Sequence, residues 1–401
     1  MSEGIFAGLK VIDCATYIAA PAAAVTLGDF GADVIKVEPL GEGDAYRHSW
    51  KAPGAAVADH NYNWILESRN KRSIALDLKQ QAAREALYAL VRETDVFITN
   101  YPPPVRHRLG VSYDDLAPLN KRMIYAAFTA YGETGPEAGK TGFDSTAWWA
   151  RSGLMDLVKP DPDSAPARSL GGMGDHPSSM GFYSAIVTAL YRRERTGQGG
   201  MVHSSLLANG LWSNGCAVQA RLCGADMKGR PAREHSANAC NNTYRCGDGR
   251  WFMLTLINEA RQWDGLARAL DHPALTTDPR FTTSNARREH ARALTALMDR
   301  IFDSKSLAEW RAILDGAGIT FGVVGVLADL DTDPQVRAAG MVVPMAGSAL
   351  ETLMSPFNIE GETKIVPRMP PELGEHGAEI LREAGYDEAA IVRLRKDRVL
   401  G

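Results

Sequence analysis

The runs LKVIDC at residues 9–14 and DVIKV at residues 33–37 decide the fold class of this chain. Each is a short, continuously apolar run with the length of a buried strand. Between them Pro21 opens a small-residue segment at 22–27, which is consistent with a helix because proline is tolerated in a helix's first turn. The order strand, helix, strand predicts two parallel strands joined by a right-handed crossover.

The same alternation continues for about another hundred residues. Residues 81–93 have a helical pattern with one apolar face, and the runs DVFIT at 95–99 and MIYAAF at 123–128 have the pattern of buried strands. Continuously apolar strands that alternate with helices predict a parallel sheet covered on both faces. We therefore expect a Rossmann-like α/β fold.

The length of 401 residues is typical of two domains. A helical pattern covers 178–195, and the composition becomes polar and rich in turn residues at 224–243. Beyond it, a strand pattern at 251–254 precedes mostly helical patterns at 259–314. We predict a large Rossmann-like domain at 1–224, a smaller α+β domain with its linkers at 225–330, and a return to the large domain at 331–401.

Composition excludes several classes of protein. Lys plus Arg number 44 and Asp plus Glu number 48, and this net charge of −4 argues against a nucleic-acid binder. No run approaches the roughly 20 apolar residues that span a bilayer, so no membrane segment is expected. The N-terminus lacks a signal-peptide pattern and the five cysteines form no C-x-x-C pair. We expect free thiols in a cytoplasmic protein.

Stock motifs for nucleotide phosphates, for a serine nucleophile and for a zinc protease are absent from the sequence. The glycine-rich runs at 171–174 and 197–200 do not follow a strand as G-x-G-x-x-G. A nicotinamide cofactor is therefore poorly supported despite the strand–helix alternation.

The run GGMGDHP at residues 171–177 is the best candidate for a chemical site. Permissive glycine backbone can approach a ligand closely, and amides near a helix N-terminus can stabilise an oxyanion. The carboxylate of Asp175 can act as a nucleophile that forms a covalent intermediate. The alternative is that Asp175, Ser178 or Ser179 caps the helix, and that His176 is structural or solvated.

Further motifs run through nearly the whole chain. The most specific are GDFGADVIKVEP at 28–39 and NKRSIALDLK at 70–79, joined by Ala20-Pro21, Gly43-Asp44, RLG at 108–110, TGQG at 196–199 and GEH at 374–376. Together they resemble the class III CoA-transferases, the family of formyl-CoA transferase and the carnitine CoA-transferases.

The resemblance implies an acyl-CoA:carboxylate CoA-transferase in which Asp175 is the catalytic aspartate. Its carboxylate would attack a thioester to give a mixed anhydride, and then an aspartyl-CoA thioester. Coenzyme A and its acyl thioesters would be substrates together with a small carboxylic acid, with no tightly bound cofactor and no metal. Asp144, in GFD at 142–144, matches an acidic position near the family's active site and would orient backbone or Asp175; the alternative is a turn or cap.

The resemblance also implies contacts with coenzyme A. Backbone would meet the cofactor in the loop after the first strand, and other positions would contact adenine or phosphate. The residues at these positions are Ile18, Ala19, Leu76, Lys79, Arg108, Leu109 and Lys140. The family fold implies an interlocked homodimer whose large domain is built from both chain ends.

Departures from the family's patterns separate the alternatives. The tetraglycine loop of formyl-CoA transferase is replaced by NACNNT at 238–243, which argues against formyl and oxalate as substrates. α-Methylacyl-CoA racemases, the alternative reading, carry a histidine where this chain has Phe143, so one of two acid/base partners is missing. A non-catalytic CoA-binding protein is the third possibility.

Overall fold

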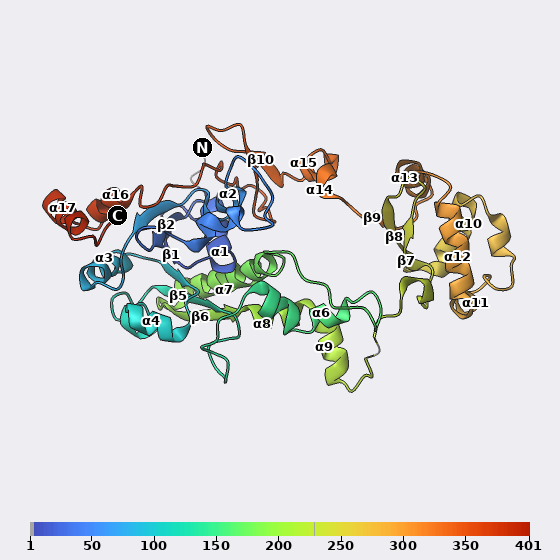
Figure 1. Cartoon of the computed structure of the whole chain (residues 1–401), viewed down its shortest axis with the longest axis horizontal. Helices are drawn as coiled ribbons and strands as arrows, with labels where there is room; N and C mark the ends of the chain where they lie inside the picture. The colour runs from blue at the N-terminus through green and yellow to red at the C-terminus, as the bar shows by residue number, and fades with distance from the viewer. Residues whose placement is uncertain (1–3, 228) are drawn as a thin grey trace. The chain divides into compact units, whose positions relative to one another are not determined.

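The computed structural model describes residues 4–227 and 229–401, which pack into two units. The first unit contains the residues up to Asp156 together with Arg168–Ala225 and Pro334–Gly401. The second contains Leu157–Ala167 and Asp226–Asp333. In Figure 1 the blue and red ends of the chain both belong to the first unit.

The first unit is built on a six-stranded sheet with the order β3-β2-β1-β4-β5-β6, in which all neighbouring strands are parallel. This is the strand order of doubly wound Rossmann-type sheets, so the expected α/β fold is confirmed. The strands are β1 (Lys10–Cys14), β2 (Asp33–Glu38), β3 (Arg72–Ala75), β4 (Val96–Thr99), β5 (Ile124–Thr129) and β6 (Gly200–Ser205).

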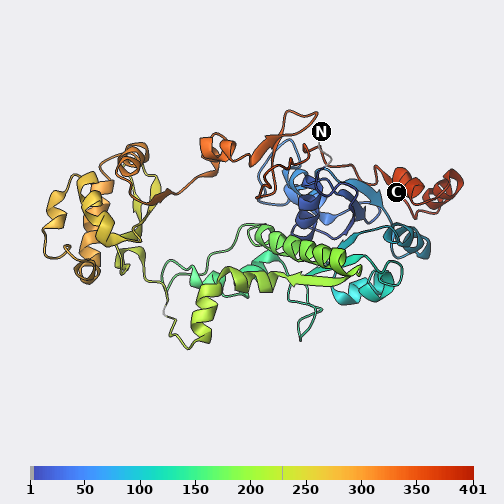
Figure 2. The same cartoon turned by 180° about the vertical axis from the view of Figure 1, so that it is seen from behind.

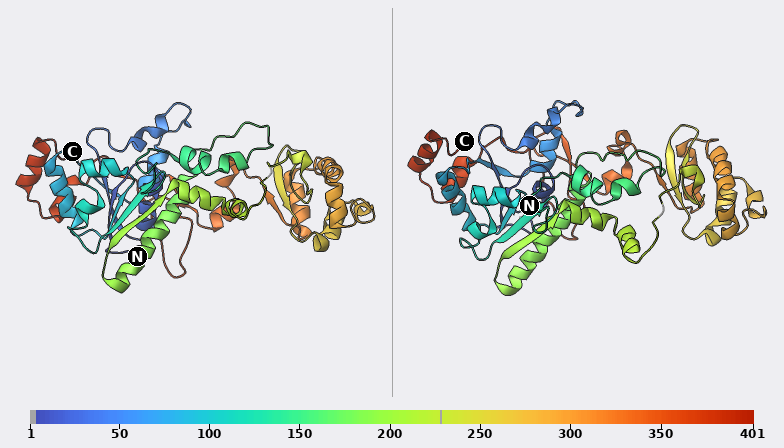
Figure 3. Two further views of the ribbon diagram at one scale, coloured as in Figure 1. Left: turned by 90° about the horizontal axis from the view of Figure 1, so that it is seen from below. Right: turned by 60° about the horizontal axis from the view of Figure 1, so that its bottom comes forward.

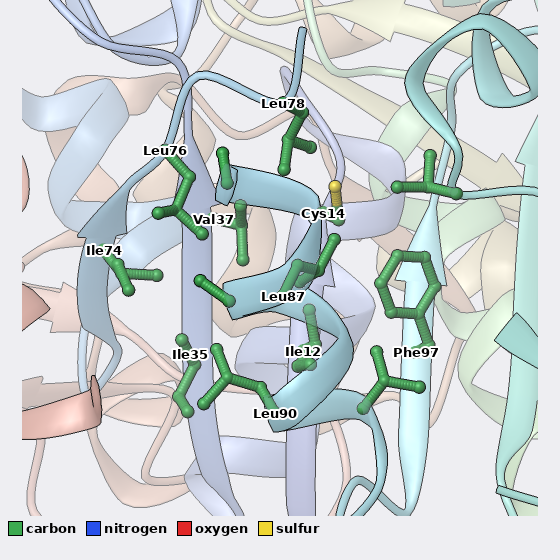
Figure 4. Close-up of a cluster of buried hydrophobic side chains, with 14 of the residues drawn as sticks. Ile12, Cys14, Ile35, Val37, Ile74, Leu76, Leu78, Leu87, Leu90 and Phe97 are labelled. Carbon is green, nitrogen blue, oxygen red and sulfur yellow. The ribbon is translucent and has the colours of Figure 1, made fainter. Parts of the chain in front are cut away.

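Successive strand residues point to opposite faces of the sheet, and each face is buried in its own apolar core. Ile12 pairs with Ile35 and Phe97 in register, and these three side chains belong to one apolar core. Figure 4 shows them with Leu87 and Leu90 of α3 (Gln81–Val91). The side chain of Val11 belongs to the core on the other face. This double burial explains why the strands are apolar without alternation.

Different parts of the chain cover the two faces. The core around Ile12 includes side chains from α3 and from the C-terminal helices α16 (Gly377–Glu383) and α17 (Glu388–Lys396). The core around Val11 includes α1 (Ala19–Asp29) and α7 (Asp175–Thr196), which pack against each other. Figure 2 shows α7 as the long helix beside α1, and Figure 3 views the sheet from two further directions.

The first unit contains further short elements: η1 (Ala45–Lys51), α2 (Tyr62–Ser68), α4 (Pro103–Leu109), α5 (Tyr113–Leu116), η2 (Asp144–Ala150), α8 (Leu206–Ser213), α9 (Gly215–Leu222), α15 (Pro334–Ala338), β10 (Val342–Pro344) and β11 (Glu351–Leu353). The helix α6 (Leu154–Leu157) runs into the second unit.

The second unit has a core of its own between a small sheet and helices. Its sheet is antiparallel with the order β7-β8-β9. The elements are η3 (Arg233–His235), β7 (Asn241–Arg245), β8 (Trp251–Thr255), α10 (Glu259–Ala269), η4 (Pro273–Thr276), α11 (Ser284–Glu289), α12 (Ala291–Phe302), α13 (Leu307–Gly316), β9 (Phe321–Val323) and α14 (Leu327–Leu330).

Two boundaries differ from the sequence pattern. The helix α7 begins at Asp175 rather than at residue 178, because Pro177 is accommodated in its first turn. The helix α1 begins at Ala19, before Pro21, for the same reason. Within the described part of the chain, no helix combines the length and apolar character needed to cross a membrane.

Candidate active site

A cavity of about 400 Å³ lies at the carboxyl ends of the central strands. Its walls include residues 16–19 after β1, residues 100–102 after β4 and residues 128–130 at the end of β5. The strands β1 and β4 are neighbours from which the strand order runs in opposite directions. In open α/β sheets ligands bind at such a switch point, so the cavity is the expected ligand site of this fold.

Asp175 contributes to the cavity wall as the first residue of α7. Gly174 occupies the capping position, and the helix has no side-chain cap. Ser178 and Ser179 instead donate hydrogen bonds to carbonyls of the preceding turn, at 2.6 and 2.7 Å. The alternative that Asp175, Ser178 or Ser179 serves as the helix cap is therefore wrong.

The Asp175 carboxylate has no hydrogen-bond partner within residues 4–227 and 229–401. Burial raises its pKa, the negative charge of Asp144 raises it further, and His176 opposes the shift. The resulting pKa is about 7. A half-desolvated carboxylate that still ionises near neutral pH has the properties of an enzymatic nucleophile or base.

Asp144 is held at the start of η2, a turn of π-helix, and only 7% of it is exposed. Its Oδ2 accepts a hydrogen bond from the backbone N–H of Gly174 at 3.3 Å, and its Oδ1 accepts one from the N–H of Ser145 at 2.6 Å. The carboxylate thus anchors the residue that directly precedes Asp175. π-Helical turns are frequent at functional sites.

The glycines before Asp175 are needed for close packing at two positions. A Cβ on Gly174 would lie 2.6 Å from the ring of the buried Trp148. Gly172 has a φ of +80°, and a Cβ there would also lie 3.1 Å from the ring of His176. Gly171 has open space around it, so the steric requirement is specific to Gly172 and Gly174.

The loop after β1 is fixed by side chains from elsewhere in the fold. Asn100 accepts a hydrogen bond from the Thr16 N–H at 2.9 Å and donates one to the Thr16 carbonyl at 2.7 Å. Tyr17 takes a φ of 63° and donates its N–H to Asp44 at 3.3 Å. A left-handed conformation is costly for tyrosine and persists only where surrounding contacts enforce it.

Buried charges lie behind this loop. Lys36 donates to the carbonyl of Ala15 and pairs with Asp44 at 3.0 Å, and Lys71 pairs with Asp13 at 2.7 Å. Burial alone would raise the pKa of Asp13, but the two lysines reverse this and hold the pKa below its usual value. Such ions are tolerated in a core only when paired, so they fix the geometry of the loop.

Five of the predicted site residues line the cavity: Ile18, Ala19, Lys140, Asp144 and Asp175. Ile18 and Ala19 lie where α1 begins, at the positive end of that helix. The ammonium group of Lys140 pairs with Glu137 at 2.9 Å and is exposed.

The other predicted coenzyme A residues do not line this cavity. Leu76 is buried in the core around Ile12, and Leu109 packs at the edge of that core. Lys79 and Arg108 are exposed. Their contacts with a ligand stay predictions.

His176 does not line the cavity. Its Nε2 lies 2.8 Å from a carboxylate oxygen of Glu67, and its Nδ1 lies 3.0 Å from the carbonyl oxygen of Gly172. Both ring nitrogens are thus engaged, and His176 is not free to replace the histidine that a racemase would have at Phe143. The ring of Phe143 lies edge-on to Tyr17 and lines the cavity.

Sequence reasoning missed Glu67 and the roles of Asn100 and Lys36. Asn100 had a detectable signal, a polar residue directly after a buried strand. Glu67 and Lys36 had none, because a charged residue within a helix or strand is usually solvated. Among the described residues no group of three or more His, Cys, Asp or Glu side chains is arranged to hold a metal ion.

A doubly wound α/β unit with a cavity at its switch point defines an α/β protein that binds a ligand at the carboxyl ends of its strands. Residues 6–377 match the model of CoA-transferase family III. The (R)-2-hydroxy-4-methylpentanoate CoA-transferase of Clostridioides difficile is 30% identical over 401 residues, covering 98% of each chain. The succinyl-CoA:glutarate CoA-transferase of Mus musculus is 30% identical, covering 96% of this chain and 88% of its own.

The crystal structure of a CAIB/BAIF family protein from Brucella suis has the same fold, with a TM-score of 0.84 at 31% identity, covering 95% of this chain and 99% of that one. The chain therefore belongs to CoA-transferase family III and is an enzyme of that family. Its substrates are CoA thioesters and carboxylic acids.

Proposed function

We propose that this enzyme moves coenzyme A between carboxylic acids through covalent intermediates on Asp175. One observation carries the proposal: the carboxylate of Asp175 lines the switch-point cavity without a hydrogen-bond partner among the described residues, with a pKa of about 7. A carboxylate used only for structure would be expected to have such a partner.

The proposed reaction has four exchanges. A carboxylate oxygen of Asp175 attacks the donor thioester and expels CoA thiolate, giving a mixed anhydride. The thiolate attacks the aspartyl carbonyl, which releases the donor acid and leaves an aspartyl-CoA thioester. The acceptor carboxylate attacks this thioester and expels the thiolate again. The thiolate then attacks the acyl carbonyl of the second anhydride, which forms the new acyl-CoA and restores Asp175.

The protein's own groups would support these steps in two ways. The Oδ2 of Asp144 accepts a hydrogen bond from the N–H of Gly174, with an N–O distance of 3.3 Å, and so fixes the backbone next to Asp175. The amides at the start of α7 carry the positive end of the helix dipole, which suits the oxyanions that form during each attack. Exclusion of water protects the anhydride from hydrolysis.

Coenzyme A would enter along residues 16–19, where α1 begins. Ile18 and Ala19 would meet it through backbone, and Lys140 would bind phosphate once it leaves Glu137. Leu76, Lys79, Arg108 and Leu109 would contact the parts of the nucleotide that extend beyond the cavity. Replacing Lys140 with Ala should raise the KM for acyl-CoA by about 10-fold at low salt with less change at high salt.

The proposed assembly is an interlocked homodimer. It is supported by a first unit formed from both chain ends, with the second unit inserted between them in sequence. Sedimentation equilibrium should give a dimer that does not dissociate on dilution. Two differently tagged versions should exchange subunits only after unfolding, whereas exchange under native conditions would contradict interlocking.

The decisive experiment is to trap the covalent intermediate. The enzyme is incubated with succinyl-CoA, acetyl-CoA or a branched 2-hydroxyacyl-CoA, treated with hydroxylamine or borohydride, and mapped by mass spectrometry. Modification at Asp175 with one or more donors supports the proposal. Asp175→Asn should give no adduct, whereas Asp114→Asn, an exposed aspartate in the first turn of α5, should react normally. Loss of α-deuterium from a branched acyl-CoA with no adduct would instead indicate a racemase.

A further inference from the structure

Glu67 and His176 form a hydrogen-bonded pair in which the carboxylate is buried and the ring is partly exposed. The carboxylate of Glu67, on α2, is 1% exposed and lies 2.8 Å from Nε2 of His176, whose side chain is 46% exposed. His176 is the second residue of α7 and follows Asp175 directly in the chain. The pair thus links α2 to the first turn of the helix that carries the nucleophile.

The hydrogen-bond pattern of this ring fixes its proton count. Nδ1 lies 3.0 Å from the carbonyl oxygen of Gly172, and a carbonyl can only accept, so Nδ1 carries a proton. Nε2 faces a carboxylate oxygen, so a second proton must lie between Nε2 and Glu67. The pair therefore holds one proton more than a neutral histidine beside an ionised glutamate would.

We propose that Glu67 and His176 act as a charge-balanced positioning pair, which clamps the glycine-rich segment 171–174 at Gly172 and keeps an imidazolium next to Asp175, where its positive charge favours the ionised carboxylate. The inference rests on the proposed role of Asp175. It assigns to His176 no contact with substrate.

The surroundings of the pair support this role. Burial would lower the pKa of His176, but the hydrogen bond and charge of Glu67, the carbonyl of Gly172 and the charge of Asp175 together outweigh burial and raise it. The titratable groups that act on the pair are Asp175 on the same helix, Lys71 before β3, which interacts with Glu67, and Tyr46 in η1, whose pKa is raised by burial and by Glu67 and Asp175. Arg69 lines the same neighbouring cavity as His176 but is paired with Asp29 at 2.7 Å.

The charges of Glu67 and His176 predict how substitutions of these two residues change the pH dependence of adduct formation at Asp175. His176→Gln keeps donors for hydrogen bonds but leaves the negative charge of Glu67 unbalanced near Asp175. The acid limb of the rate of adduct formation should then move to higher pH by roughly one unit. Adding Glu67→Gln removes that charge, so the double variant should move back toward the parent. A purely structural pair would instead make the double variant as impaired as the single one, or more so.

The test combines two measurements on the full-length enzyme. In ¹⁵N-histidine-labelled parent protein, the ring signals that disappear in His176→Gln should show both nitrogens protonated at pH 7.5. The pH profile of adduct formation at Asp175 is then measured for the parent, His176→Gln, the double variant and His60→Gln, an exposed histidine used as the control. A His176 ring with one unprotonated nitrogen at pH 7.5, or an unmoved acid limb in His176→Gln, would overturn the proposal.

The two measurements separate the possible failures. If the parent forms no adduct with any donor, the proposed function fails, while the nitrogen spectra still decide whether the pair holds its extra proton. If adducts form and the imidazolium is absent, the positioning pair fails and the proposed function stands. Melting curves of the variants confirm folding, which is expected because the His176 side chain is 46% exposed.

Discussion

The Oδ2 of Asp144 accepts a hydrogen bond from the backbone N–H of Gly174, 30 residues away, with an N–O distance of 3.3 Å. This bond joins a π-helical turn to the residue that precedes the proposed nucleophile. The same carboxylate raises the pKa of Asp175 through its charge. Asp144 thus affects both the position and the ionisation of Asp175, and substitutions can separate the two effects.

Replacing Asp144 with Asn keeps an oxygen that can accept the Gly174 N–H but removes the charge. The pKa of Asp175 should fall, so the acid limb of adduct formation should move from near pH 7 to lower pH by roughly one unit. Asp144→Ala also loses the acceptor, and should in addition slow the reaction about 10-fold at its pH optimum. Rate measurements from pH 5 to 9 check both. An acid limb that stays in place in Asp144→Asn would refute the electrostatic effect.

Replacing Gly174 with Ala should displace the active-site loop, because the new Cβ would lie 2.6 Å from the ring of Trp148. A shift of this kind should reduce the rate of adduct formation by about 10- to 100-fold. Gly171→Ala is the matched control, since nothing lies within 4 Å of its Cβ position. Single-turnover rates of the two variants compare them. Equal rates would show that the packing of Gly174 against Trp148 is not required.

Replacing Asp175 with Asn should stabilise the protein at alkaline pH. The folded pKa of about 7 lies above the unfolded value of 3.8, so the folded state binds more protons between these values. The Asp175 ionisation therefore makes the parent less stable as pH rises from about 4 to 7. Asn has no such dependence. Relative to the parent, the free energy of unfolding of the variant should rise by roughly 2–3 kcal/mol from pH 5 to pH 8.

Urea melts at the two pH values measure this difference. Asp114→Asn, on the exposed face of α5, should show no comparable change. A difference in the free energy of unfolding between variant and parent that is the same at pH 5 and pH 8 would mean that Asp175 ionises without a cost in the folded protein.

Replacing Lys36 with Met should unfold the loop region or the whole first unit. The ammonium group is fully buried and lies 3.0 Å from Asp44 and 3.6 Å from Asp13. Its loss would leave buried carboxylates unbalanced, at a cost of about 3–5 kcal/mol. Lys51→Met is the control, because Lys51 is exposed. Thermal melts compare the two, and a small change in Lys36→Met would show that water or a proton replaces the lysine.

Much of the fold could be predicted from the chain because its strands are buried on both faces. The runs at 9–14, 33–37, 95–99 and 123–128 became β1, β2, β4 and β5. The strand β3 was not predicted, because it has only four residues and begins with Arg72, whose charge is met by Asp33 of β2 and by α16. Its pairing depends on parts of the chain about 40 and 300 residues away, which local patterns do not report.

The sequence by itself determined the alternation of strands and helices, the family, and the glycine-flanked carboxylate that the enzyme is proposed to use. These depend on periodicity and on short motifs, which are local properties. The tertiary structure decided the environment of that carboxylate: which charges lie near Asp175, which amide Asp144 holds, and that His176 bonds to Glu67. The pKa of a group depends on burial and on charges that come from distant segments, so only the folded chain fixes it.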